Sequence, residues 1–191
     1  MFGLSDYVLF EKDENGLEDF IKNGDWQGIN VTIPYKKAVV PYLDWLDDSA
    51  EKVGCVNTVL RRDNKLCGYN TDYYGFDELV NSSEIDFEGK KILILGTGGA
   101  SLAVKAVCEK HNAGKLVFIS RSGEDNYENI EKHADADIII NTTPVGMYPK
   151  SLVSPVNLEG FTLLSAVFDV IYNPLKTKRY LYSVRAAHRL R

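Results

Sequence analysis

The stretch KILILGTGGAS, residues 91–101, decides the fold class because it joins a strand pattern, a glycine-rich turn and the start of a helix. Its first five residues form an apolar run typical of a strand buried on both faces. Gly96 permits the tight turn, and Gly98 leaves room for a pyrophosphate to approach the backbone. The helix that follows directs free N–H groups and the positive end of its dipole toward such an anion. This order predicts a dinucleotide-binding unit; the alternative is a glycine-rich turn without a ligand.

The end of the next expected strand, residues 116–120, indicates which dinucleotide is bound. Sites that prefer NAD usually carry Asp or Glu about 20 residues after the glycine turn, where the acid holds the ribose 2′-hydroxyl. This chain has Arg121 flanked by Ser120 and Ser122, a combination that suits a 2′-phosphate because Arg can bind it with two parallel hydrogen bonds. The pattern predicts NADP(H); the alternative for Arg121 is a solvated surface charge. Glu124 and Asp125 are interpreted as loop residues.

Strands and helices alternate through the C-terminal half of the chain. We expect helices at 100–110 and 126–133, and further strands at 137–141 and 166–169. Such alternation predicts a doubly wound parallel sheet with right-handed crossovers. The polar stretch 81–90, NSSEIDFEGK, marks a boundary, so this domain is placed at 86–191.

The N-terminal half, residues 1–85, has a mixed pattern that predicts a second α/β domain. We expect strands at 7–10 and 28–32, a hairpin of 55–61 and 65–69 around Asp63-Asn64, a helix from a cap at Asn15 to Lys22, a helical segment at 38–46 broken by Pro41, and a helix at 72–80 with Thr71 or Asp72 near its cap. The predicted fold class is therefore α/β with two domains.

Composition excludes several classes of protein. The 191 residues are 45% hydrophobic and 26% charged, which is too apolar for a disordered chain. A net charge of −5 argues against a nucleic-acid partner. No apolar run approaches the roughly 20 residues that span a bilayer, and no signal peptide is visible, so we expect a cytoplasmic protein. Three cysteines without CxxC spacing favour reduced thiols over a disulfide or a metal site.

Four polar clusters stand where expected strands end, at residues 30–36, 54–58, 68–72 and 141–147. Ligands of open α/β sheets bind outside the carboxyl ends of the strands. Each cluster alone is compatible with a turn or a helix cap, but their joint occurrence predicts a ligand site.

These clusters also carry a resemblance. The motifs NVTIPYK, GCVNT, GYNTD, GTGGAS, SRS, NTTPVGM and FDVIYNP occur in the order and at the spacing of the shikimate dehydrogenase family, which this chain resembles along nearly its whole length. The resemblance implies a substrate domain followed by an NADP-binding Rossmann domain. It also implies reversible, NADPH-dependent reduction of 3-dehydroshikimate to shikimate, a step of chorismate and aromatic amino acid biosynthesis. The alternatives are a quinate-using relative and a weakly active or non-catalytic NADP-binding module.

The resemblance also implies roles for individual residues. Lys36 and Asp72 match the catalytic pair, which fits the chemistry because hydride transfer to a ketone leaves negative charge that an ammonium group can stabilise and protonate. The alternative is a structural ion pair, and which of the two is the formal acid or base stays open. The implied substrate-binding set is Thr32, Lys36, Asn57, Asp72 and Tyr172; the implied cofactor-binding set is Gly96, Thr97, Gly98, Gly99, Ala100, Ser120, Arg121, Ser122 and Val170. No metal is expected.

The resemblance further implies segments that this sequence does not contain. In the family, two serines that hold the substrate carboxylate come before the position of Met1, and a substrate-binding glutamine follows that of Arg191. We therefore expect this chain to bind NADPH with ordinary affinity and shikimate poorly. The expected partners are a small-molecule substrate and, in a homodimer, a second copy; a monomer is equally compatible.

Overall fold

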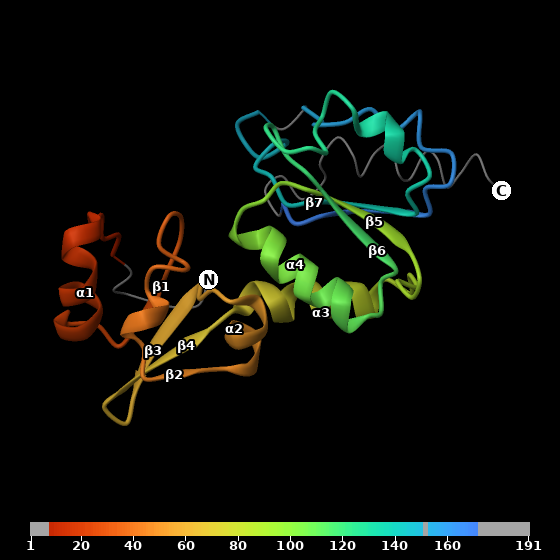
Figure 1. Ribbon diagram of the computed structural model, residues 1–191. Helices are drawn as coiled ribbons and strands as arrows, with labels where there is room; N and C mark the ends of the chain where they lie inside the picture. The colour runs from red at the N-terminus through yellow and green to blue at the C-terminus, as the bar shows by residue number, and fades with distance from the viewer. Residues whose placement is uncertain (1–7, 151–152, 172–191) are drawn as a thin grey trace.

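The computed structural model describes residues 8–150 and 153–171, which form two four-stranded sheets (Figure 1). Helices α3 (Thr71–Ser82) and α4 (Gly99–Lys110) lie between the sheets in the view of Figure 1. The α/β class predicted from the sequence is confirmed, and the second sheet is the parallel one. Among the described residues, no helix is long and apolar enough to cross a membrane.

The first sheet is mixed, with strand order β1-β3-β4-β2. Its strands are β1 (Gly28–Asn30), β2 (Trp45–Leu46), β3 (Thr58–Arg62) and β4 (Lys65–Tyr69). Strand β3 runs antiparallel to β1 and β4, and β2 runs parallel to β4. Asp63 and Asn64 both have positive φ, 51° and 57°, as a two-residue hairpin turn requires. The predicted hairpin is confirmed, although its first strand is Thr58–Arg62 and does not begin at residue 55.

Helix α1 (Glu14–Asn23) covers this sheet with one apolar face, in which Leu17 and Ile21 are buried. Its N-cap is Asp13, whose Oδ1 accepts a hydrogen bond from the Gly16 N–H at 2.8 Å. The prediction that Asn15 caps the helix is therefore wrong. Asp13 serves because its carboxylate reaches back to an otherwise unpaired N–H of the first turn.

Two other expected elements of this half are absent. Residues 8–10 have no regular structure and are exposed, so the strand expected at 7–10 is wrong for them. The helix expected at 38–46 is only a single 3-10 turn, Val40–Tyr42, followed by β2. Pro41 cannot donate a helical hydrogen bond, and the chain beyond it pairs with β4 instead, beginning with the Asp44 N–H on the Leu66 carbonyl at 3.0 Å.

The second sheet is all parallel, with order β6-β5-β7-β8. Its strands are β5 (Lys91–Leu95), β6 (Lys115–Ile119), β7 (Ile138–Asn141) and β8 (Ala166–Asp169). The ranges of β5 and β8 are as predicted, that of β6 lies one residue earlier, and β7 begins one residue later than predicted. The helix expected at 126–133 is only the 3-10 turn η2 (Ile130–His133), preceded by a turn in which Asn126 Oδ1 accepts the N–H groups of Glu128 and Asn129.

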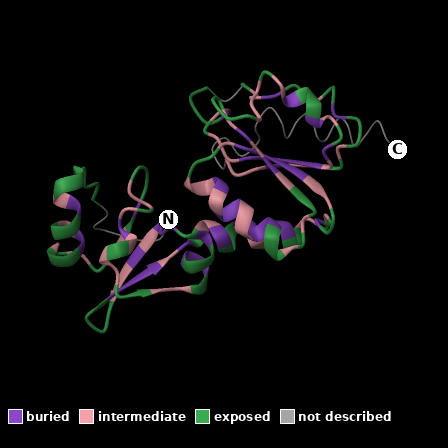
Figure 2. Cartoon of the chain, viewed as in Figure 1, coloured by how far each residue is buried: buried purple, intermediate pink, exposed green. Residues whose placement is uncertain are grey.

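Both faces of the second sheet are buried (Figure 2). Helices α3 and α4 cover one face, where Phe76 and Val107 pack with Ile94. The turn η2 and the loop before β8 cover the other, where Ile130 and Phe161 pack with Leu93 and its neighbours. The continuous apolar sequence of β5 reflects this double burial.

Helix α3 connects the two halves of the chain. It begins at the end of β4 with Asn70 as its N-cap, not Thr71 or Asp72 as expected, because Asn70 Oδ1 accepts the Tyr73 N–H at 3.2 Å. Its buried side chains, Phe76 among them, belong to the core of the second sheet. Short helix α2 (Asp48–Val53) contributes Val53 to the same core. The apolar core of the second sheet therefore includes residues from both sides of position 85, such as Phe76 and Ile94. The domain boundary placed at residue 85 stays a prediction.

Candidate active site

A cavity of about 740 Å³ lies at the carboxyl ends of β5, β6 and β7. One wall is the glycine turn, residues 96–100, and another is residues 142–145 after β7. Thr32, Ile33 and Lys36, which follow β1 of the other sheet, complete the lining on one side. The cavity therefore draws on both halves of the chain, and it lies at the edge where open α/β sheets bind ligands.

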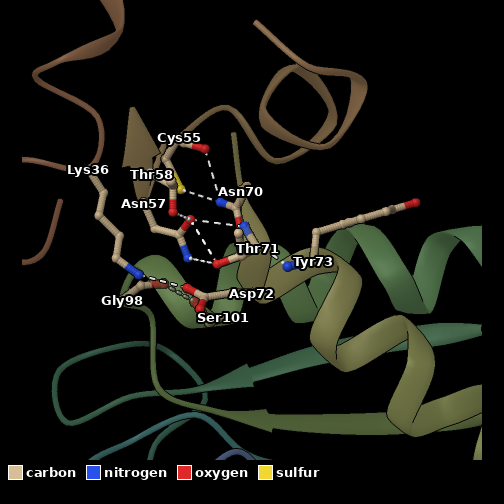
Figure 3. A network of polar contacts seen from close by, with 10 residues as sticks. All are labelled: Lys36, Cys55, Asn57, Thr58, Asn70, Thr71, Asp72, Tyr73, Gly98 and Ser101. Atoms are coloured by element: carbon tan, nitrogen blue, oxygen red, sulfur yellow. Dashed lines mark hydrogen bonds and ion pairs between the residues drawn. The ribbon is translucent and has the colours of Figure 1, made fainter. Parts of the chain in front are cut away.

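Lys36 and Asp72, which are 36 positions apart in the sequence, form an ion pair at this cavity. The Lys36 Nζ donates to Asp72 Oδ2 at 2.7 Å, and the side chains are 19% and 38% exposed respectively (Figure 3). Asp72 is the second residue of α3. The stem of Lys36 lies over the start of α4, where a Cβ added to Gly99 would come 3.0 Å from Lys36 Cδ. The ammonium group is thus held between α3 and the glycine turn.

A polar network fixes the start of α3 and, with it, Asp72 (Figure 3). The buried Asn57 side chain binds Thr71 through both of its polar atoms: its Oδ1 accepts the Thr71 N–H, and its Nδ2 donates to Thr71 Oγ1, both at 2.9 Å. The fully buried Asn70 donates from Nδ2 to the Cys55 carbonyl at 2.9 Å. Asn57, expected to hold substrate, therefore also contacts the residue next to Asp72.

The glycine turn has the geometry of an anion cradle. Gly96 has φ of 107°, and a Cβ there would come 2.9 Å from Thr142 Oγ1. A Cβ on Gly98, in contrast, would meet no atom of the described chain within 4 Å. Gly98 is the N-cap of α4, so the first-turn N–H groups of that helix face this open space. A dinucleotide pyrophosphate fits such a site.

Not every expected cofactor residue lines the cavity. Ser120 and Arg121 do, and Arg121 is exposed to solvent. Ser122 and Val170 are not among the described lining residues, and Val170 instead packs against the core of the second sheet. Tyr172 lies outside the described residues.

Residues 142–145 line the cavity, although no individual role was predicted for them. Asn141 at the end of β7 shapes this segment: its buried Oδ1 accepts from the Thr143 N–H at 3.1 Å and hydroxyl at 2.7 Å, and its Nδ2 donates to Asp169 Oδ1 at 2.9 Å. Residues 142–145 belong to the polar cluster 141–147, which was predicted from its place at a strand end to contribute to a ligand site. Two further lining residues, Tyr127 and Pro155, stand in no motif of the sequence.

The three cysteines offer no competing chemistry. All are buried and unpaired. Burial raises the pKa of Cys55 and raises that of Cys108 to about 12, so both stay protonated thiols at neutral pH. Across residues 8–150 and 153–171, no three His, Cys, Asp or Glu side chains gather into a group that could hold a metal ion.

Comparison with known proteins agrees with this geometry. Residues 4–59 match the family described as the shikimate dehydrogenase substrate binding domain. A curated shikimate dehydrogenase (NADP(+)) of Clostridium beijerinckii is 41% identical over 187 residues, covering 90% of this chain and 69% of that protein.

Two crystal structures extend the comparison. Shikimate dehydrogenase 1 from Peptoclostridium difficile superposes with a TM-score of 0.76 at 39% identity, covering 94% of this chain and 70% of that one. The Thermus thermophilus shikimate 5-dehydrogenase, solved with NADP(H) and shikimate, superposes with a TM-score of 0.71 at 30% identity, covering 91% and 68%.

Proposed function

This chain belongs to the shikimate dehydrogenase family, and we infer that it catalyses the reversible, NADPH-dependent reduction of 3-dehydroshikimate to shikimate. It is an oxidoreductase acting on a CH–OH group, in aromatic amino acid biosynthesis. The curated relatives are NADP(+) enzymes, which identifies NADP(H) as the cofactor and favours neither a non-catalytic module nor a quinate enzyme.

The observation that carries the proposal for the site is the position of Lys36. Its ammonium is bound to Asp72 at 2.7 Å, while its stem lies over the glycine turn that suits the pyrophosphate. A substrate ketone in the cavity would therefore lie between a cation and the cofactor site. This arrangement supports Lys36 and Asp72 as the catalytic pair.

Each group in this arrangement has a chemical task. NADPH, when bound, supplies the hydride. The Lys36 ammonium stabilises the negative charge that develops on the substrate oxygen and donates the proton that completes the alcohol. Asp72 orients the ammonium through a charge-assisted hydrogen bond and exchanges that proton with solvent through its exposed side.

The remaining roles follow from position. Thr32 at the cavity wall, Asn57 beside Thr71, and Tyr172 are proposed to bind substrate hydroxyl groups. Residues 96–100 would hold the pyrophosphate, and Ser120, Arg121 and Ser122 would hold the 2′-phosphate, with Val170 near the nicotinamide.

We also propose a substrate domain at 1–85, a nucleotide domain at 86–191, a cytoplasmic location, a monomer or homodimer, and no nucleic-acid or membrane partner.

The direct test is turnover by the purified protein. Shikimate and NADP⁺ are supplied together, and formation of NADPH is followed by absorbance, with quinate and with NAD⁺ as comparison substrates. We expect turnover that depends on shikimate and is faster with NADP⁺. Absence of turnover with shikimate, or equal rates with quinate, would contradict the proposed activity.

A further inference from the structure

Arg121 lies in a loop that is closed at its base. The Ser120 N–H donates to the Asp125 carbonyl at 3.2 Å, and Ser120 forms a parallel bridge with Asn126. Residues 121–124 project from this base and are exposed. Where Arg121 points therefore depends on how firmly the base is held.

The side chain of Asp125 holds this base against η2. Its Oδ1 lies 2.9 Å from Lys132 Nζ and 2.8 Å from His133 Nε2. His133 is buried, with a side chain only 11% exposed, so it is a fixed anchor. The hydrogen bonds from Lys132 and then His133 hold the pKa of Asp125 below its usual range, so the carboxylate is charged at neutral pH. Asp125 thus connects the base of the Arg121 loop to η2, which covers one face of the second sheet.

The direction of this carboxylate also matters. Asp125 lies in the loop just beyond the strand end where NAD-preferring sites place an acid that binds the 2′-hydroxyl. Here the carboxylate binds two cationic or proton-donating groups of η2, and it is not among the described residues that line the cavity. A carboxylate turned toward the cavity would repel a 2′-phosphate, which carries close to two negative charges.

We propose that Asp125 is a positioning residue that sets the preference for NADPH over NADH. Its pairing with Lys132 and His133 keeps Arg121 and Ser120 at the cavity and keeps an acid away from the 2′-phosphate. This inference rests on the proposed function, because it assumes that the 2′-phosphate binds at Arg121.

The loop has enough other bonds to survive the loss of this side chain. Asn126 Nδ2 donates to the Gly123 carbonyl at 3.2 Å, and Asn129 Nδ2 donates to the Glu124 carbonyl at 2.9 Å. We therefore expect variants of Asp125 to fold and to keep the loop, but to change the direction in which the loop holds Arg121.

The test compares Asp125→Ala with two reference variants of the full chain. Arg121→Ala gives the loss expected when the phosphate ligand itself is removed. Asp135→Ala removes a more exposed carboxylate after η2, which pairs with Lys91 and also interacts electrostatically with His133, so it controls for the loss of negative charge near His133. Calorimetry gives the dissociation constants of NADPH and NADH, and of 2′,5′-ADP and 5′-AMP, for each protein.

We expect Asp125→Ala to weaken binding of NADPH and 2′,5′-ADP about tenfold, the size of one misplaced charge-assisted contact, and to change binding of NADH and 5′-AMP less than twofold. Asp135→Ala should change none of them. Asp125→Asn keeps an acceptor for His133 but loses the charge, so it should fall between the parent and Asp125→Ala.

If Asp125→Ala weakens NADPH and NADH binding equally, the ratio of the two dissociation constants stays unchanged, and the positioning role would be overturned. If Asp125→Ala does not fold, Asp125→Asn and Lys132→Met decide by the same ratio. A parent that binds NADPH no better than NADH would contradict the proposed cofactor site as well, whereas a parent with the preference and variants without any change would refute this inference alone.

Discussion

Lys36 has two separable parts, an ammonium bound to Asp72 and a stem packed over Gly99. Lys36→Met removes the charge and keeps most of the stem. We expect this variant to lower kcat at least about a hundredfold, the usual contribution of a positioned proton donor. NADPH affinity should stay within about twofold of the parent.

Steady-state kinetics and NADPH titration measure both effects, and circular dichroism controls for folding. Lys37→Met, at the exposed neighbouring lysine, is the matched control and should be nearly fully active. A Lys36→Met enzyme with near-parental kcat would refute the catalytic role.

Gly96 and Gly98 are two residues apart, yet they are glycines for different reasons. A Cβ at Gly96 would face both a positive φ and the Thr142 hydroxyl, whereas a Cβ at Gly98 would project into open space. Gly96→Ala should therefore lower the free energy of unfolding by about 1 kcal/mol or more. Gly98→Ala should lower it less, because Gly98 has a negative φ and open space beside it, and only the poorer N-cap preference of Ala acts against the variant. It should weaken NADPH binding at least tenfold, because the methyl group occupies the space of the pyrophosphate.

Urea unfolding and NADPH calorimetry on the two variants separate these effects. The contrast between them is the diagnostic result, so each variant serves as the control of the other. Unchanged NADPH affinity in Gly98→Ala would show that the open space beside Gly98 is not where the cofactor binds.

The sequence predicted the Lys36–Asp72 pairing through its motifs, but not what holds it. Nothing in the sequence around Asn57 shows that its amide binds Thr71, because the two residues are 14 positions apart and the hairpin between them brings them together. Asp125 was interpreted only as a loop residue. Its partners, Lys132 and His133, lie in the 3-10 turn η2, where the sequence pattern predicted a helix.

At the scale of elements, strands buried on both faces were the most predictable. The apolar run of β5 is continuous because β5 pairs on both sides and is buried on both faces, and β7, buried along its whole length, shows the same kind of run. Segment 38–46 was not predictable in this way, because its apolar spacing fits a helix until tertiary pairing with β4 competes with it. Short edge strands such as β2 carry too few residues to show a period.

An ion-pair cluster joins α3 to the end of α4. Asp77 accepts from Lys110 Nζ at 2.6 Å and lies 2.8 Å from His111 Nε2. Burial alone would raise the pKa of Asp77, but the bonds from Lys110 and His111 outweigh it and hold the pKa below its usual value. A carboxyl with a lowered folded-state pKa stabilises the fold above its unfolded pKa, and this contribution is lost as the pH falls through the folded value.

We therefore expect Asp77→Asn to lower the free energy of unfolding by about 1 kcal/mol at pH 7. The effect is no larger because Lys110 is exposed and solvent weakens its ion pair with Asp77. The difference from the parent should shrink as the pH falls below about 4, near the ordinary aspartate pKa. Urea unfolding across this range measures it. Glu78→Gln, an exposed acid on the same helix, is the control and should show no comparable trend. A constant difference at all pH values would contradict the ion-pair explanation.

At the scale of the whole molecule, α3 makes the two sheets interdependent. Its first turn is fixed by Asn57 from the first sheet, while Phe76 packs in the core of the second, with its ring 5.9 Å from that of Phe168. Separation of the two sheets would expose this core and remove the Lys36–Asp72 pair from the glycine turn. The same packing that stabilises the chain thus keeps the Lys36–Asp72 ion pair beside the glycine turn.

This coupling predicts that damage to the far side of the second sheet unfolds the first. Both tryptophans of the chain, Trp26 and Trp45, lie in the first half, so their fluorescence reports the first sheet. Ile139 is fully buried on the face of the second sheet opposite α3. Ile139→Ala should cost about 2–5 kcal/mol through the cavity that it leaves, and this loss should appear in the tryptophan transition as well as in circular dichroism. Leu163→Ala, exposed in the loop before β8, should shift neither signal. An unchanged tryptophan midpoint in Ile139→Ala, beside a lowered midpoint by circular dichroism, would mean that the halves unfold independently and that α3 does not couple them.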